Sequence, residues 1–211
     1  MGVITNLVDN FDVIERDILR FDSEDDVYFV QVLKRRKENP DMDTNCRVIS
    51  QYIIHSIEEL HALRDTIIEK CKTHNARAYI NPNRRSKEKI ALELLKLTAN
   101  RIAEKQYKGL ENDFYRAVGQ VGTNGQKMWI VDVDMKEGDL DALTTICILS
   151  QYLTGLKPDV GTSKVVTIVP TLNGFHIITR PFDIQTFKEM CGENIPDIHK
   201  NNPTLLWVEK K

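Results

Sequence analysis

Two aspartates at the end of an apolar run are the residues of this sequence best suited to chemistry. The segment Met128–Asp134 closes on Asp132 and Asp134, two positions apart. Alternate side chains of an extended strand share a face, so both carboxylates point the same way, roughly 6.6 Å apart at about 3.3 Å per residue. Like charges on one face repel unless a cation or a basic group lies between them, which makes a divalent metal site one interpretation of the pair. On the spacing alone, a strand that runs out into a solvated acidic turn is the simpler interpretation.

The elements around these acids follow a regular order in the second half of the chain. Periodicity and turn residues predict the β-α-β-β-α-β order of a ferredoxin-like or RRM-like unit. Its expected strands are Lys127–Val133, Lys164–Val169, Gly174–Thr179 and Leu205–Glu209, and its expected helices are Leu140–Leu153 and Ile184–Met190.

The first half predicts a second α/β layer. Strands are expected at Val27–Leu33, Arg47–Ile54 and Ala76–Ile80, and helices at Asp12–Arg20, after Ser56 and after Ser86. Serine followed three residues later by glutamate is a helix-start signal, and Ser56 with Glu59 has this spacing. Gly119, Gly122 and Gly125 make the segment from Gly109 to Gln126 loop-rich. We therefore expect an α/β (α+β) protein in which an N-terminal α/β subdomain, residues 1–120, packs in one globule with an RRM-like subdomain, residues 121–211.

This topology brings a histidine to the acids. The first and third strands of a β-α-β-β-α-β unit are antiparallel neighbours, so the end of the first meets the start of the third. If Phe175 and Ile177 pack against the helices, His176 lies on the open face beside Asp132 and Asp134.

The two motifs resemble those of the archaeo-eukaryotic primase (primase-polymerase) superfamily. They read Val131–Asp132–Val133–Asp134 and Thr171–Leu172–Asn173–Gly174–Phe175–His176. The resemblance covers about half of the chain and implies a nucleotidyltransferase of DNA replication. It implies that Asp132 and Asp134 bind Mg²⁺ or Mn²⁺, and that His176 contacts the phosphates of an incoming nucleotide.

The third motif of that family, an apolar residue followed by an acid, matches poorly. Asp183 and Glu209 are expected too far away or at the wrong end of a strand. Asp197 is the candidate third metal ligand, with a turn residue as the equal alternative. If no third acid reaches the site, the protein binds nucleotide without polymerising it.

Several basic residues are candidates for binding phosphate, because arginine binds phosphate in a bidentate manner. Arg180 follows the histidine strand, and Arg77 and Arg84 flank an Asn-Pro-Asn turn. A solvated corner is the more favoured interpretation of Arg84. The run Lys34–Lys37 has the charge to follow a nucleic-acid template, DNA above all, although simple exposure is the favoured interpretation there as well.

Other functions remain open. Palm-type polymerases and cyclases keep an acid in the hairpin between the middle strands, and residues 170–174 contain none. A non-catalytic RRM-like module that binds nucleic acid or a protein partner requires aromatic residues on the open face, where this sequence places acids.

Composition describes an ordinary globular protein: 211 residues, 41% hydrophobic, with a net charge of −2. That charge argues against binding nucleic acid through bulk positive charge. With no signal-peptide pattern, no membrane-spanning run and four scattered cysteines, we expect a cytoplasmic protein with reduced thiols. Helicase or zinc functions would have to come from replication partner proteins.

Overall fold

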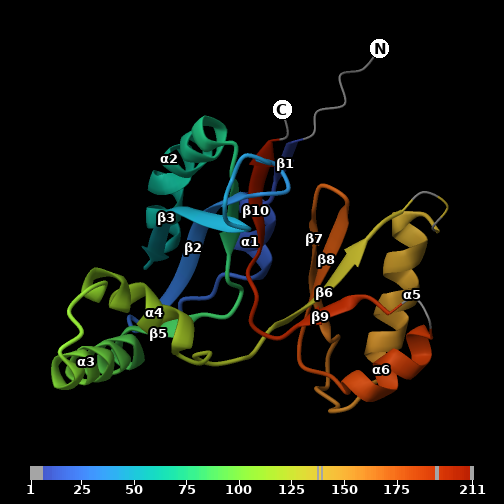
Figure 1. Cartoon of the computed structure of the whole chain (residues 1–211). Helices are drawn as coiled ribbons and strands as arrows, with labels where there is room; N and C mark the ends of the chain where they lie inside the picture. Colours follow the sequence, from blue (N-terminus) through green and yellow to red (C-terminus); the bar gives the residue numbers. More distant parts are fainter. Residues whose placement is uncertain (1–6, 137, 139, 193–194, 210–211) are drawn as a thin grey trace.

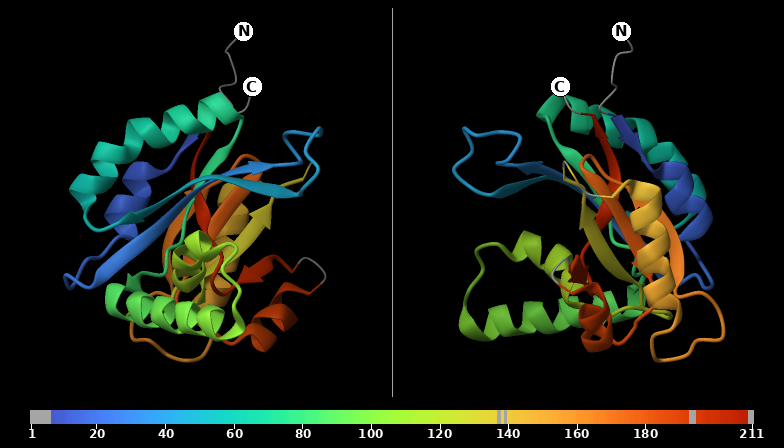
Figure 2. Two further views of the ribbon diagram at one scale, coloured as in Figure 1. Left: turned by 60° about the vertical axis from the view of Figure 1, so that its left-hand side comes forward. Right: turned by 90° about the vertical axis from the view of Figure 1, so that its right-hand side faces the viewer.

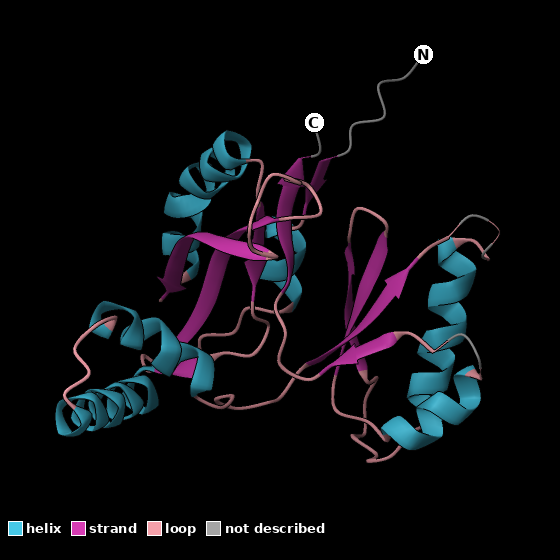
Figure 3. Cartoon of the chain, in the orientation of Figure 1, coloured by secondary structure: helices cyan, strands magenta, loops and turns pink. Residues whose placement is uncertain are grey.

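The computed structural model describes residues 7–136, 138, 140–192 and 195–209, which form a mixed α+β protein with two antiparallel sheets. Within these residues there are six α-helices and one short 3₁₀ helix, and none of them is long and apolar enough to cross a membrane. The two sheets lie side by side, with helix Phe11–Asp17 in contact with both of them and further helices on their outer sides (Figures 1 and 3).

The larger sheet has the strand order β1-β10-β4-β2-β3, with β5 paired to β2. Its strands are β1 Leu7–Asp9, β2 Asp26–Arg35, β3 Cys46–Ile54, β4 Arg77–Ile80, β5 Arg85–Ser86 and β10 Thr204–Glu209. Helices α1 (Phe11–Asp17) and α2 (Ile57–His74) pack on it. The Ser56 hydroxyl caps α2 by accepting a hydrogen bond from the Glu59 amide at 3.2 Å, as its spacing predicts.

The smaller sheet has the strand order β7-β8-β6-β9, and all of its pairs are antiparallel. The chain passes in turn through β6 Trp129–Asp134, α5 Ala142–Thr154, β7 Val165–Pro170, β8 Gly174–Thr179, α6 Ile184–Cys191 and β9 Asp197–His199. Helices α5 and α6 cover one face, where Val131 and Val133 are buried with Phe175, Ile177 and Phe187. The other face turns toward the larger sheet (Figure 2).

The last strand is the main correction to the expected fold. Leu205–Glu209 was expected to complete the RRM-like unit, but β10 lies between β1 and β4 in the larger sheet. The short strand β9 occupies the expected place beside β6. β9 has only three residues and follows a proline, which explains why its periodicity is too weak to recognise in the sequence.

Two buried asparagines join the sheets. Asn10 donates to the carbonyl oxygens of Pro170 and Leu205 at 2.9 and 3.0 Å. Asn83 donates to the Met128 carbonyl at 2.8 Å and accepts from the Met128 amide at 2.7 Å. A common apolar core reinforces these links, because Ile130, Val169 and Ile178 of the smaller sheet pack in one cluster with residues of α1, α2 and the larger sheet. These hydrogen bonds and the common core therefore fix the position of one sheet relative to the other.

The segment expected to be loop-rich contains a helix. Helix α3 (Lys87–Glu104) is followed by a short 3₁₀ helix, Leu110–Asn112, and by α4 (Asp113–Gln120). The carboxylate of Asp113 is fully buried and accepts hydrogen bonds from Arg101. This contact depends on residues twelve positions apart, so local glycine content did not reveal it.

Candidate functional site

Strand pairing brings the histidine to the first aspartate. In the β6–β8 ladder Asp132 is opposite His176, and Asp134 is opposite Gly174. Opposite residues of an antiparallel pair share a face, so His176 and Asp132 meet. Nε2 of His176 lies 3.3 Å from Oδ1 of Asp132. The expected juxtaposition of imidazole and carboxylate is thus present in the structure.

The larger sheet fixes the orientation of this imidazole. Nδ1 of His176 lies 2.8 Å from the hydroxyl of Thr204, a fully buried residue at the start of β10. The ring is held at both nitrogens, and only 12% of its side chain is exposed. Because Thr204 belongs to the other sheet, the site depends on the packing of the two sheets.

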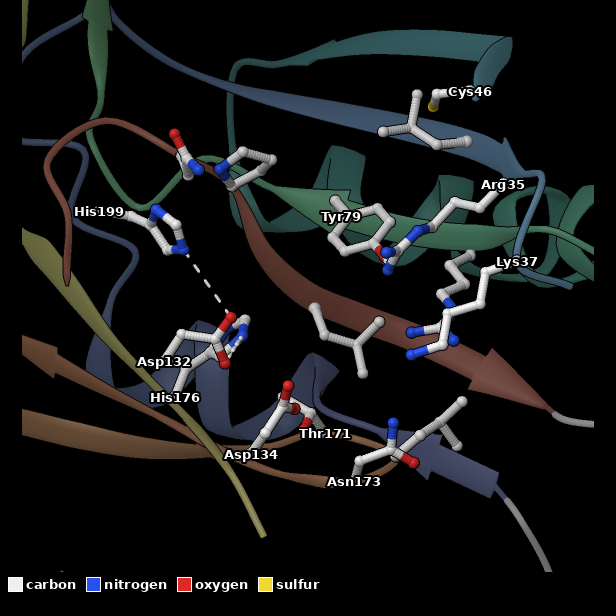
Figure 4. A pocket seen from close by; sticks show the side chains of 16 residues that line it. Arg35, Lys37, Cys46, Tyr79, Asp132, Asp134, Thr171, Asn173, His176 and His199 are labelled. Atoms are coloured by element: carbon white, nitrogen blue, oxygen red, sulfur yellow. Dashed lines mark hydrogen bonds and ion pairs between the residues drawn. The ribbon is translucent and has the colours of Figure 1, made fainter. Parts of the chain in front are cut away.

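A second imidazole approaches the same carboxylate from the opposite side. His199 on β9 places Nε2 3.8 Å from Oδ2 of Asp132 (Figure 4). The hydrogen bond from His176 holds the pKa of the Asp132 carboxyl below its ordinary value, against the opposing effect of burial. Asp132 is therefore an ionised carboxylate between two imidazoles.

A cationic wall faces these acids across a cavity of about 340 Å³. Arg35 and Lys37 of the β2–β3 hairpin line it from the larger sheet, opposite Asp132, Asp134 and His176 (Figure 4). Arg77 of β4 also belongs to its lining. The opposition of cations and acids makes this cavity, which we call the cationic cavity, suited to an anion that carries bound metal.

Neighbouring side chains hold two of the three cations. Nη1 of Arg35 donates to the hydroxyl of Tyr79 at 3.2 Å, and Nη2 of Arg77 donates to Glu38 at 2.5 Å. The Arg35 charge also contributes to the lowered pKa of Asp132. Arg35 therefore acts electrostatically on the carboxylate that it faces.

Two of the arginines proposed to bind phosphate lie elsewhere, which corrects those assignments. Arg180 follows the far end of β8, four residues from His176, and its guanidinium donates to Thr162. Arg84 donates to the carboxylate of Asp22 and to the carbonyl of Asn124, both at 2.6 Å. Neither is part of the described lining of the cationic cavity. Of the three, Arg77 lines the described part of the cationic cavity.

Asp197 lies next to the acids but on a different cavity. It is paired with Asp132 in the β6–β9 ladder and therefore shares its face. It is exposed and lines a second cavity, of about 530 Å³, to which Asp132 and Asp134 also contribute. Among the described residues, no group of three His, Cys, Asp or Glu side chains is gathered closely enough to hold a metal by itself.

Sequence reasoning did not place Arg35, Lys37, His199 or Thr204 at this site, although it named the run Lys34–Lys37 as a candidate for following a template. In the charged run at 34–37, the alternate residues Arg35 and Lys37 line the cavity, whereas Arg36 between them is not part of its described lining. Strand periodicity extended past Leu33 was the available signal for the two basic residues. His199 and Thr204 had no such signal, because both depend on strands whose pairing was not predicted.

Comparisons of this chain with protein families, with curated proteins and with solved structures found no match.

Proposed function

We propose that this protein is a metal-dependent nucleotidyltransferase, similar in its site to the catalytic core of primase-polymerases. The observation that carries the proposal is the pairing of Asp132 with His176 at 3.3 Å, facing Arg35 and Arg77 across one cavity. Metal-binding acids, a phosphate-binding imidazole and cations that neutralise a triphosphate are the parts that phosphoryl transfer requires.

The carboxylates fit Mg²⁺ or Mn²⁺ that arrives with a nucleotide. Mg²⁺ is usually held by one or two carboxylates together with substrate phosphates and water, so a complete cage of protein ligands is not required. Asp132 and Asp134 supply the two carboxylates, and Asp197, which is paired with Asp132 in the β6–β9 ladder, is the candidate third ligand. A divalent ion bound there would neutralise charge on the transferred phosphate.

The protein's own groups then bind and orient the triphosphate. His176, held by Thr204, presents Nε2 toward the cavity beside Asp132. Arg35, Arg77 and Lys37 provide donors on the opposite wall. Cations on one side and carboxylates on the other would orient the triphosphate chain across the cavity, which positions the phosphorus for attack.

The order of elements supports an RRM-like core. The β-α-β-β-α-β order and the antiparallel strand order β7-β8-β6-β9 are those of the ferredoxin-like arrangement, with β9 as the fourth strand. The alternative, a non-catalytic RRM-like module, is less favoured, because Phe175 and Trp129 pack with the helices and the opposite face is covered by the larger sheet. A nucleic-acid template, DNA in particular, and replication partner proteins remain part of the proposal.

Thermal unfolding with nucleotide tests the proposal. Wild type should gain stability with dNTP or NTP plus Mn²⁺, and the double variant Asp132→Ala/Asp134→Ala should not, since ligands stabilise only the state that binds them. Asp41 and Asp43 form a second D-x-D in the exposed β2–β3 loop, so Asp41→Ala/Asp43→Ala is a matched control that should respond like wild type. An equal shift in wild type and in the Asp132/Asp134 variant would refute the proposal.

A further inference from the structure

Helix α3 has apolar residues on two opposite faces, and the fold of the chain uses one of them. Ile90, Leu94 and Leu97 pack in a core cluster with residues of β2 and α4. At about 3.6 residues per turn, these three positions lie on one side of the helix. A helix that is apolar on all sides is normally buried, whereas α3 lies at the edge of the molecule opposite the smaller sheet (Figure 1). The face turned away from the cluster therefore needs another explanation.

This outer face of α3 has the spacing of a coiled-coil seam. Leu92, Leu95, Ala99 and Ile102 are exposed and follow one another at intervals of three, four and three residues. These are successive a and d positions of a heptad, the positions that one helix packs against another. Among the described residues, half of the large apolar side chains that are exposed lie between positions 92 and 114, a concentration typical of an interaction site. We call the four residues the α3 seam.

Lysines border the α3 seam. Positions e and g of the same heptad include three lysines and no acid; they are Lys89, Ala91, Lys96, Thr98, Ala103 and Lys105. Side chains at e and g form the ion pairs that decide which helices associate. Lys96 lies 3.4 Å from Glu93, but the lysine side chain is 67% exposed and remains open to a second acid. The seam is therefore suited to a helix whose own bordering residues are acidic.

A second copy of this chain does not match the charges of the seam. Antiparallel association of two seams would place Lys96 of one copy against Lys96 of the other, where like charges repel. Parallel association would place Ala99 against Ala99, which leaves a gap in the packing and brings no acid to the lysines. An anionic membrane is also less suitable, because a strict a and d seam is narrower than the apolar face of a helix that lies in a bilayer surface.

From these observations we propose that the α3 seam binds an acidic amphipathic helix of another protein. The apolar a and d residues of that helix pack on Leu92, Leu95 and Ile102, and its acids at e and g pair with the lysines. The inference does not rest on the proposed nucleotidyl transfer, because no residue of α3 belongs to the described lining of the cationic cavity or of the second cavity. The partner would therefore bind without covering Asp132.

Two synthetic helical peptides test this assignment on the full chain. Both have leucine at a and d; the acidic peptide has glutamate at e and g, and the basic peptide has lysine there, so that like charges keep each peptide from associating with itself. Fluorescence anisotropy of the labelled peptides measures Kd for wild type, for Leu95→Gln and for Lys96→Glu. The matched controls are Leu143→Gln on α5, at a side chain that is 75% exposed, and Lys188→Glu at an exposed position of α6.

Wild type should bind the acidic peptide roughly tenfold more tightly than the basic peptide, which is the difference that three exposed ion pairs can supply. Leu95→Gln should weaken binding of the acidic peptide roughly tenfold through the loss of apolar burial. Lys96→Glu should weaken the acidic peptide and strengthen the basic one. Both controls should bind as wild type does. Because Leu95 is 67% exposed, Leu95→Gln should also melt as wild type does, and Lys96→Glu keeps the test independent of any loss of stability.

Four results would overturn the assignment. The first is no binding of the acidic peptide or equal affinity for both peptides, and the second is an unchanged Kd in Leu95→Gln. The third is a wild-type dimer in sedimentation equilibrium that Leu95→Gln dissociates, which would assign the seam to a second copy of the chain. The fourth is binding of wild type to phosphatidylcholine vesicles that contain phosphatidylserine, lost in Leu95→Gln, which would assign the seam to a lipid surface.

Discussion

Replacing Gly174 by alanine should separate the two strands that carry the site. Gly174 lies opposite Asp134, where the Met135 amide donates to the Asn173 carbonyl at 2.8 Å. A Cβ added at Gly174 would overlap the carbonyl oxygen of Val133, and it would lie 3.0 Å from the carbonyl carbon and 3.1 Å from the Met135 nitrogen. These are backbone atoms, so no side-chain rotation relieves the overlap.

The expected cost follows from what must move. Overpacking of this kind costs about 1–3 kcal/mol. Each ladder hydrogen bond lost as the strands separate costs about 1 kcal/mol more. We therefore expect Gly174→Ala to lower the free energy of unfolding by about 2–4 kcal/mol, which for a chain of this size lowers Tm by roughly 5–15 °C.

Denaturant titration and thermal melting measure the loss of unfolding free energy. The rise in Tm on adding nucleotide with Mn²⁺ measures the effect on the site. Gly119→Ala is the matched control: it lies in α4 with no atom within 4 Å of an added Cβ. Alanine is favoured over glycine inside a helix by about 0.5–1 kcal/mol, so this control should be neutral or slightly stabilised. A Tm of Gly174→Ala within about 2 °C of wild type would be well below the expected loss. The two strands would then not be as close as described, and our account of this glycine would be wrong.

Three further predictions concern the site and the junction of the sheets. Arg35→Ala should weaken Mn²⁺–dNTP binding roughly tenfold through loss of a charge-assisted hydrogen bond, whereas Arg36→Ala, at the exposed neighbouring position, should leave it unchanged in the same titration. The lowered pKa of Asp132 adds stability that is full above its ordinary pKa of 3.8 and is lost as the pH falls through the lower native value. Asp132→Asn should therefore flatten the dependence of unfolding free energy on pH below about pH 4, and an unchanged slope would contradict this. Asn83→Asp loses the donor to the Met128 carbonyl and should cost about 1–3 kcal/mol in urea unfolding, with a midpoint equal to wild type as the refuting result.

The sequence was sufficient to predict contacts that depend on strand alternation and on the pairing of β6 with β8. Alternation predicts that Asp132 and Asp134 share a face, and antiparallel pairing places His176 beside them; the structure has both features. Each inference needed only a local period and one neighbour relation.

The site residues that the larger sheet supplies could not be predicted from the sequence, for a physical reason. Thr204 contacts His176 only because β10 inserts between β1 and β4, and a six-residue apolar strand carries no signal for which sheet it joins. Arg84 shows a related limit: a solvated corner was its favoured interpretation and phosphate binding the alternative, yet its guanidinium is bound by Asp22 and Asn124. Charge identifies candidate groups, whereas their availability depends on tertiary neighbours.

The position of β10 also bears on how the protein is made. A ribosome releases Thr204–Glu209 after every other described element, yet this strand sits in the interior of the sheet begun by Leu7–Asp9. Until it emerges, β1 lacks its partner and β4 has an open edge. Nascent chains should therefore become resistant to protease only after synthesis has passed this strand. Shorter translation products would lack the complete larger sheet and also the Thr204 hydroxyl that holds the imidazole of His176.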